Sequence, residues 1–326
     1  MYISIFSSCG TKVISTWHNR LAMTDDVGRR ISELKAQNGT IVLAHNYQLP
    51  EVQDVADFVG DSFGLSVKAS QTDAKVIIFC GVDFMAESAL ILNPTKRVVV
   101  PDPGAMCPMS AMITPEALRK LKAENPGVPV VAYVNTSAAV KAETDVCCTS
   151  SNAVKVVKSL GAKKVIFVPD RNLGLYVQRY VKETELILWP GYCPTHQRIT
   201  VDKLKEMRKA HPEAEIIVHP ECTPEVIDAA DAAASTEGMV NRVKASQKNE
   251  FILGTEVEHA YRMRRLFPDK VFYPIPGTVC PNMKRTTLVK VLHSLEALET
   301  TISIPEDILR KARKPLDRMV EIGRGD

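Results

Sequence analysis

The sequence predicts an α/β fold made of three pseudo-symmetric α/β/α modules, with small parallel sheets placed around a pseudo-threefold axis. Three observations predict this fold. Cys-Pro pairs recur at nearly constant spacing, at Cys107, Cys193 and Cys280. Short β-branched runs alternate with amphipathic segments, as in parallel sheets covered by helices. The 326 residues are enough for two or three domains, each with its own core.

Other residues keep the same register as the cysteines. Each copy begins with an apolar run that ends in a polar triplet, starting at His45, Tyr133 or His219. An aspartate, a hydroxyl and a second carboxylate then follow in every copy. These marks are Asp57, Asp145 and Asp231, then Ser62, Ser150 and Thr236, then Asp83, Asp170 and Glu256. Four independent marks that stay in register over three copies indicate an internal repeat.

Within each module we expect a strand, a loop, a helix, a strand, a helix and a strand, followed by the Cys-Pro loop. The first strand is the apolar run before the triplet. The second and third strands are predicted at 76–79 and 97–101, at 164–169 and 186–190, and at 251–254 and 271–276. Helices that begin near Pro115 and after Thr200 should link successive modules, and a closing helix is expected over 305–319.

The repeat predicts module boundaries at 25–110, 111–197 and 198–326, the last module including the closing helix. Residues 1–24 form an extension outside the repeat. Their Ser/Thr-rich composition suggests a transit peptide only faintly, and a disordered tail or a later start at Met23 fits better.

Composition narrows the class of function. The net charge is +3, from 41 basic and 38 acidic side chains, and no basic stripe is present, so a small-molecule ligand is expected rather than nucleic acid. No apolar stretch approaches the ~20 residues that span a bilayer, so no membrane association is expected. Eight cysteines without a secretory signal indicate a reducing compartment, the cytoplasm, and thiols kept for metal rather than for disulfides.

Polar residues at the predicted strand ends should form one site. In parallel α/β folds the ligand binds beyond the carboxyl ends of the strands, which here carry the triplets, the second carboxylates and the cysteines. Modules around one axis would bring these side chains together. The hydroxyls of Ser62, Ser150 and Thr236 stand at predicted helix starts, where they could simply cap the helices, but three in register favour anion binding.

The cysteines indicate an iron–sulfur cluster. Structural zinc sites use cysteine pairs of the Cys-x-x-Cys type, which are absent, whereas three distant thiolates can hold a [4Fe-4S] cluster and leave one iron open as a Lewis acid. The other cysteines do not recur with the repeat, and we interpret them as small buried hydrophobic residues, with a redox role left open. They are Cys9, Cys80, Cys147, Cys148 and Cys222.

From Ile41 to the end, the chain resembles quinolinate synthase, the A protein of prokaryotic NAD biosynthesis. The resemblance is carried by long motifs, among them AHNYQLPEVQDVADFVGDS, GVDFMAE, YVNTSA, CPTHQ, VHPEC and CPNMKRTTL. It implies three pseudo-symmetric domains around a [4Fe-4S] cluster. It also implies condensation of iminosuccinate with dihydroxyacetone phosphate to give quinolinate, with loss of phosphate and two waters. The first 24 residues have no counterpart in the family pattern.

The resemblance also assigns roles to residues. Cys107, Cys193 and Cys280 match the cluster ligands. The residues expected to bind the dicarboxylate are His45, Ser62, Tyr133, Asn135, Ser150, His219, Glu221 and Thr236. Tyr47 would be a general acid/base, Glu221 a second proton acceptor, and His196 would lie close by. An L-aspartate oxidase or dehydrogenase would supply the imine.

Two other functions remain open from the sequence. An aconitase-like hydro-lyase also uses a three-cysteine cluster with an open iron, but it would act on a single substrate. A non-catalytic carrier or sensor of iron–sulfur clusters would have little use for three polar strand ends that face one cavity.

Overall fold

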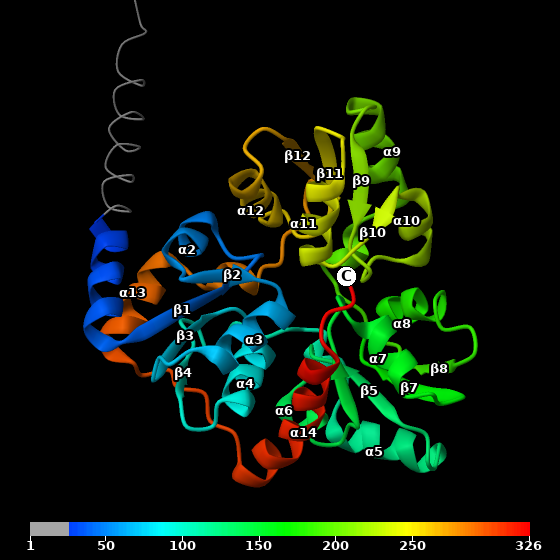
Figure 1. The fold of residues 1–326 in the computed structure, drawn as a ribbon, viewed down its shortest axis with the longest axis horizontal. Helices are drawn as coiled ribbons and strands as arrows, with labels where there is room; N and C mark the ends of the chain where they lie inside the picture. Colours follow the sequence, from blue (N-terminus) through cyan, green and yellow to red (C-terminus); the bar gives the residue numbers. More distant parts are fainter. Residues whose placement is uncertain (1–25) are drawn as a thin grey trace, which may run out of the picture.

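A computed structural model describes residues 26–326, so the predicted extension and Cys9 lie outside the described residues. Figure 1 shows three lobes, coloured blue to cyan, green, and yellow to orange. Each lobe contains a four-stranded sheet in which all the strands are parallel, flanked by helices. The expected α/β fold with three similar modules is confirmed.

The first module follows a helix at residues 26–38 and has the strand order β2-β1-β3-β4. Its elements are β1 (Thr40–His45), α2 (Pro50–Val55), β2 (Phe58–Gly60), α3 (Ser62–Gln71), β3 (Val76–Cys80), α4 (Asp83–Leu92) and β4 (Arg97–Val99).

The second and third modules repeat this strand order as β6-β5-β7-β8 and β10-β9-β11-β12. The second contains β5 (Val130–Tyr133), α6 (Ala138–Lys141), β6 (Val146–Cys148), α7 (Ala153–Ser159), β7 (Lys164–Val168), α8 (Arg171–Gln178) and β8 (Glu185–Leu188). The third contains β9 (Glu215–Val218), α10 (Pro224–Ala229), β10 (Ala232–Ala233), α11 (Thr236–Ala245), β11 (Glu250–Gly254), α12 (His259–Leu266) and β12 (Val271–Pro274).

The prediction of three strands per module was wrong, because each sheet has a fourth strand at one edge. These strands, β2, β6 and β10, are only two or three residues long, too short for a periodic pattern to reveal them. The repeated aspartate before each one explains their position. Asp57, Asp145 and Asp231 accept the backbone N–H groups of Val42, Val130 and Ile216 at 2.8, 2.7 and 2.8 Å. Each aspartate therefore ties the short edge strand to the first strand of its sheet.

Two linking helices begin where the sequence predicted. They are α5 (Pro115–Glu124) and α9 (Val201–Ala210), capped by the side chains of Thr114 and Thr200. A third helix of this kind, α13 (Leu288–Ala297), was not predicted, although Thr287 caps it in the same way. Its apolar face packs against β1 and β3 of the first module, with Val291 and Leu295 fully buried. This helix lies in the range predicted for the third module but covers the first.

The closing helix is confirmed as α14 (Glu306–Ile322). Its buried residues Ala312, Leu316 and Met319 belong to a core shared by the first and second modules, where it contacts α4, α6 and β6. None of the helices in the described part of the chain combines the length and apolar character needed to cross a bilayer.

Residues 323–326 then run to the point where the three modules meet, marked C in Figure 1. Arg324 pairs with Asp61 of the first module at 2.7 Å. The backbone N–H of Gly325 donates to Ser151 O of the second module at 3.1 Å. Asp326 accepts a hydrogen bond from Ser235 of the third module. This short segment therefore binds all three modules.

Candidate active site

The three Cys-Pro loops line one cavity of about 300 Å³, together with Tyr47 and Glu221. Burial raises the pKa of the Cys107 thiol to about 12, and it also raises the pKa values of Cys193 and Cys280. These thiols therefore stay protonated unless a bound cation compensates the thiolate charge. The non-recurring cysteines of the described chain, Cys80, Cys147, Cys148 and Cys222, are buried and free.

The repeated second carboxylate holds two of the three cysteine loops. Asp83 accepts the backbone N–H of Cys107 at 2.9 Å, and Glu256 accepts that of Cys280 at 3.2 Å. Asp170 stands one residue nearer to its cysteine, and its Oδ2 is buried without a partner among the described residues. Asp83 and Glu256 therefore position their cysteine loops, and Glu256 also lines the thiol cavity.

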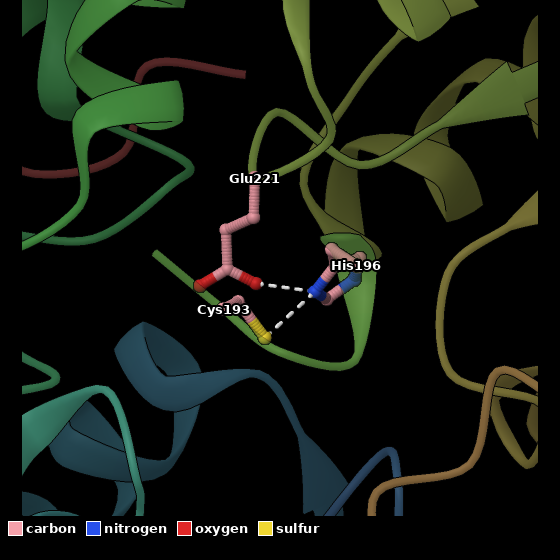
Figure 2. A group of neighbouring side chains, drawn as sticks. All are labelled: Cys193, His196 and Glu221. Atoms are coloured by element: carbon pink, nitrogen blue, oxygen red, sulfur yellow. Dashed lines mark hydrogen bonds and ion pairs between the residues drawn. The ribbon is translucent and has the colours of Figure 1, made fainter. Parts of the chain in front are cut away.

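Three of the side chains that line this cavity, Cys193, His196 and Glu221, form a tighter group, which Figure 2 shows. His196 Nδ1 is 2.7 Å from Glu221 Oε2 and 3.2 Å from Cys193 Sγ. Among the described residues this is the one set of three side chains whose ligand atoms all lie within 4.8 Å of one another. A tetrahedral metal ion would separate its N and O ligand atoms by about 3.3 Å, so the 2.7 Å contact is a hydrogen bond.

A second, smaller cavity of about 40 Å³ adjoins the first, with Tyr47, Glu221 and Met283 lining both. Its walls hold nearly all the residues predicted to bind substrate: His45, Ser62, Tyr133, Ser150, His219, Glu221 and Thr236. The exception is Asn135, which is absent from the lining of either cavity. Its side-chain oxygen is buried and has no hydrogen-bond partner within residues 26–326.

The hydroxyls in this cavity are not the helix caps. Asp61 caps α3 by accepting the N–H of Gly64 at 2.7 Å, and Ser235 caps α11 by accepting that of Gly238 at 3.0 Å. Ser62 and Thr236 are the first residues inside these helices. Because neighbouring residues do the capping, the two hydroxyls can face the cavity.

The two equivalent histidines are held in the same way. His45 Nδ1 accepts the backbone N–H of Tyr47 at 3.2 Å, and His219 Nδ1 accepts that of Glu221 at 3.3 Å. The His45 ring then carries its proton on Nε2. His219 Nδ1 also lies 3.3 Å from Glu221 Oε2, and His219 Nε2 lies 3.2 Å from Ser150 Oγ. Burial lowers the pKa of His45 to about 3 and also lowers that of His219. Both rings are therefore neutral hydrogen-bond donors.

Tyr47 and Glu221, which border both cavities, have pKa values pushed apart. Burial, reinforced by the charge of Glu221, raises the pKa of Tyr47 well above its usual value. Burial also opposes ionisation of Glu221, but His196 and His219 outweigh it and hold the pKa of Glu221 well below its usual value. A protonated phenol thus faces an ionised carboxylate, as in sites that carry out acid/base chemistry.

The sequence analysis missed three polar residues that hold the site. Thr255, directly after β11, lies between Tyr47 and His196. Asn46 donates to Thr236 Oγ1 at 2.7 Å and accepts from Arg262 at 2.8 Å. Asn46 lies inside the first triplet, and this position could have suggested it. Arg262 lies on α12 outside every repeated mark, so the repeat offered no signal for it.

Fold and site together define an α/β enzyme whose three modules share one centre of thiols, histidines and carboxylates. The family described as "NadA: Quinolinate synthetase A protein" matches residues 29–321. The chain belongs to the quinolinate synthase family, and the family resemblance seen in its motifs is confirmed. It is an enzyme of NAD biosynthesis.

Relatives named quinolinate synthase cover almost the whole chain. The protein from Dehalococcoides mccartyi is 50% identical over 300 residues, which are 92% of this chain and 99% of the relative. That from Pelobacter propionicus is 50% identical over 303 residues, 93% of this chain and 100% of the relative. That from Thermodesulfovibrio yellowstonii is 49% identical over 300 residues, 91% of this chain and 99% of the relative.

Proposed function

We propose that the enzyme condenses iminosuccinate with dihydroxyacetone phosphate to give quinolinate, with loss of phosphate and two waters. The observation that carries this proposal is the sharing of Tyr47 and Glu221 between a thiol-lined and a hydroxyl-lined cavity. Acid/base groups at that boundary can reach a substrate that is held in the second cavity and reacts near the first.

Cys107, Cys193 and Cys280 are proposed to hold a [4Fe-4S] cluster. Two features of the donor set support it. First, the three thiols come from three loops around one cavity. Second, a single metal ion would require the three sulfur atoms to lie within 4.8 Å of one another, and in the described chain they do not form such a group. When bound, the cluster would supply an open iron that acts as a Lewis acid toward a substrate hydroxyl or carboxylate.

The smaller cavity is proposed to bind a carboxylate group of the substrate. Its volume of about 40 Å³ suits one small polar group. Ser62, Ser150 and Thr236 offer hydroxyls from three modules, and the neutral ring of His45 offers an N–H group. Because the donors are neutral, orientation of the dicarboxylate depends on hydrogen bonds rather than on a net positive charge. Tyr133 closes one wall, and Asn135 is proposed to join when the substrate extends beyond the cavity.

Proton transfers are assigned to the side chains at the boundary. Tyr47, kept protonated by burial, can donate a proton to a leaving oxygen. Glu221 can accept a proton from a carbon or nitrogen of the substrate, and it holds His196 through the 2.7 Å hydrogen bond. Condensation, tautomerisation and dehydration all need such paired donors and acceptors.

The cellular setting is proposed from the chemistry of the site. Three thiols kept for a metal need a reducing compartment, so we place the enzyme in the cytoplasm. Its imine substrate must come from oxidation of an amino dicarboxylate, so we propose functional coupling to an L-aspartate oxidase or dehydrogenase. No contact with nucleic acid or membrane is part of this proposal.

The test is quinolinate formation by anaerobically purified protein given iminosuccinate and dihydroxyacetone phosphate, with iron and acid-labile sulfide counted on the same sample. Product together with about four irons per chain would support both the reaction and the cluster. A full cluster without product, in a protein that dehydrates a single hydroxy acid, would replace the proposal with the aconitase-like hydro-lyase. A full cluster with neither activity would favour a cluster carrier.

A further inference from the structure

Lys141, the last residue of α6 in the second module, is a fully buried lysine. Its Nζ donates to the carbonyl oxygen of Thr136 and lies 5.5 Å from the centroid of the Phe84 ring, which lines the thiol cavity. Burial lowers the pKa of Lys141, although the charge of Glu87 on α4 opposes this effect. A buried ammonium group is costly unless other groups compensate it, so we looked for a task that this side chain performs.

The carbonyl that the lysine holds belongs to the loop after β5. This loop, residues 134–137, carries Asn135 and directly follows Tyr133, two of the residues predicted to bind substrate. At the end of the loop, the N–H of Ala138 donates to Glu87 of the first module at 2.7 Å. The lysine adds a contact to the middle of the loop, one residue after Asn135.

The first module has the same contact at the equivalent place. Counted from the first residue of each triplet, the lysine occupies the position of Gln53, and Thr136 occupies that of Gln48. Gln53 is also buried, and its Nε2 donates to Gln48 O at 2.8 Å. The loop that it holds carries Tyr47. Because two chemically different side chains make the same contact, the hydrogen bond rather than the charge recurs in the repeat.

The third module holds its triplet loop in another way. The equivalent position is Ile227, whose side chain has no hydrogen-bond donor. There the carbonyl of Glu221 accepts a hydrogen bond from Nδ2 of Asn172, a buried residue of the second module, at 3.1 Å. Each triplet loop is thus held by a buried donor, and each has at its third position a residue of the proposed site, namely Tyr47, Asn135 or Glu221.

We propose that Lys141 is a positioning residue, which holds residues 134–137 so that Asn135 and Tyr133 can bind a carboxylate of the substrate. The proposal rests on the proposed function, because that function makes these two residues part of the dicarboxylate site. Without a donor at position 141, the carbonyl of Thr136 would lose its partner and the loop would shift. The charge of the lysine is not required for this role, since glutamine performs it in the first module.

The experiment compares Lys141→Met, which removes the donor and keeps the length of the side chain, with Lys141→Gln, which reproduces the first module. Calorimetric titration of anaerobic protein with quinolinate should give a Kd about 10-fold higher for Lys141→Met, the change expected when a hydrogen bond from a charged group is lost. Lys141→Gln should stay within about threefold of wild type. Lys122→Met is the matched control, because Lys122 Nζ donates to Glu143 O at 2.7 Å, in the same module but outside the triplet loop. It should bind quinolinate like wild type.

Two further readouts separate positioning from a general loss of stability. In turnover, Lys141→Met should raise KM for iminosuccinate and leave kcat within about threefold, because the affected contacts bind substrate and transition state alike. In the resting protein, hydrogen exchange of residues 134–138 should become faster in Lys141→Met and not in Lys141→Gln. Should Lys141→Met fail to fold, the same comparison is made with Glu87→Gln added to both variants, so that no buried carboxylate is left without compensation.

A wild-type Kd in Lys141→Met, unchanged hydrogen exchange in that variant, or equal losses in Lys141→Met and Lys141→Gln would each overturn the proposal. Failure of the proposed function gives a different result. Wild-type protein would then neither bind nor form quinolinate, whereas hydrogen exchange of residues 134–138 would still respond to Lys141→Met.

Discussion

The thiol-lined side and the polar side of the centre use the threefold repeat differently. On the thiol side every module contributes the same residue, at Cys107, Cys193 and Cys280. At the third position of the polar triplets the modules diverge, to Tyr47, Asn135 and Glu221. Repeated positions thus place similar donors on all sides of the site, whereas the divergent positions carry the phenol and the carboxylate that we propose as acid and base.

The same division appears three residues after each cysteine. His196 occupies that position in the second module, where the first and third have Ser110 and Met283. Only the histidine reaches both Glu221 and Thr255. Residues shared by all modules thus line the site evenly, whereas the residues to which we assign proton transfer stand where the modules differ.

Substitution of a cysteine that recurs in all three modules should have the largest effect. Cys107→Ala, Cys193→Ala or Cys280→Ala should each prevent cluster retention and lower quinolinate formation by at least ~100-fold, because a ligand is lost outright. Iron counts and turnover on anaerobic samples would measure it. Cys148, which is buried in β6 and is not among the residues that line the thiol cavity, provides the control, and Cys148→Ala should keep the cluster. Full activity in any of the three ligand variants would contradict the three-ligand assignment.

Substitution of Glu221, which stands at a position where the modules differ, should stop turnover without removing metal. Glu221→Gln keeps the size of the side chain but removes the charge that holds His196 and His219. We expect kcat to fall by about 10²–10⁴-fold, with normal iron content. The control is Glu225→Gln, an exposed carboxylate in the first turn of α10, which should behave as wild type. Loss of iron in Glu221→Gln would instead make Glu221 part of the metal site.

The pH dependence of stability tests the buried environment of His45, the first residue of the first triplet. The folded-state pKa of His45 is about 3 and its ordinary value is 6.5. Below pH 6.5 His45 becomes protonated in the unfolded chain, whereas in the folded protein it stays neutral down to about pH 3. The contribution of His45 to the free energy of unfolding is therefore complete above pH 6.5. It decreases as the pH falls from 6.5 towards 3, by about 1.4 kcal/mol per pH unit for one proton. His45→Asn should flatten this slope in denaturant unfolding, and an unchanged slope would refute the assignment.

The smallest expected effect concerns the segment that binds all three modules. Arg324→Ala should destabilise the protein by about 1–2 kcal/mol, since it leaves the carboxylate of buried Asp61 without its partner while Arg324 is itself partly exposed. Denaturant unfolding measures the change. Arg30→Ala, which breaks an exposed pair with Glu33, should cost under about 0.5 kcal/mol. Equal effects of the two substitutions would mean that the Asp61 pair has no special role.

Much of the site could be predicted because the residues that line it are the ones that recur in the repeat. Cysteines, hydroxyls and triplets keep a common spacing, and parallel strands bring such positions to one edge. The edge strand β10 could not be predicted, because two residues show no periodicity. Thr255 was not predicted because it does not recur. The equivalent positions in the other two modules carry Val82 and Pro169. The partners of α13 depend on distant packing that no local pattern reports.

The position of α13 has a consequence for synthesis of the chain. The sheet face formed by Val42, Ala44 and Ile78 is buried against Leu288, Val291 and Leu295. On the ribosome the first module emerges long before that helix, and nascent chains fold in order from the N-terminus. One apolar face of the first module therefore stays incompletely covered until nearly the whole polypeptide has been made, which gives chaperones a defined surface to protect.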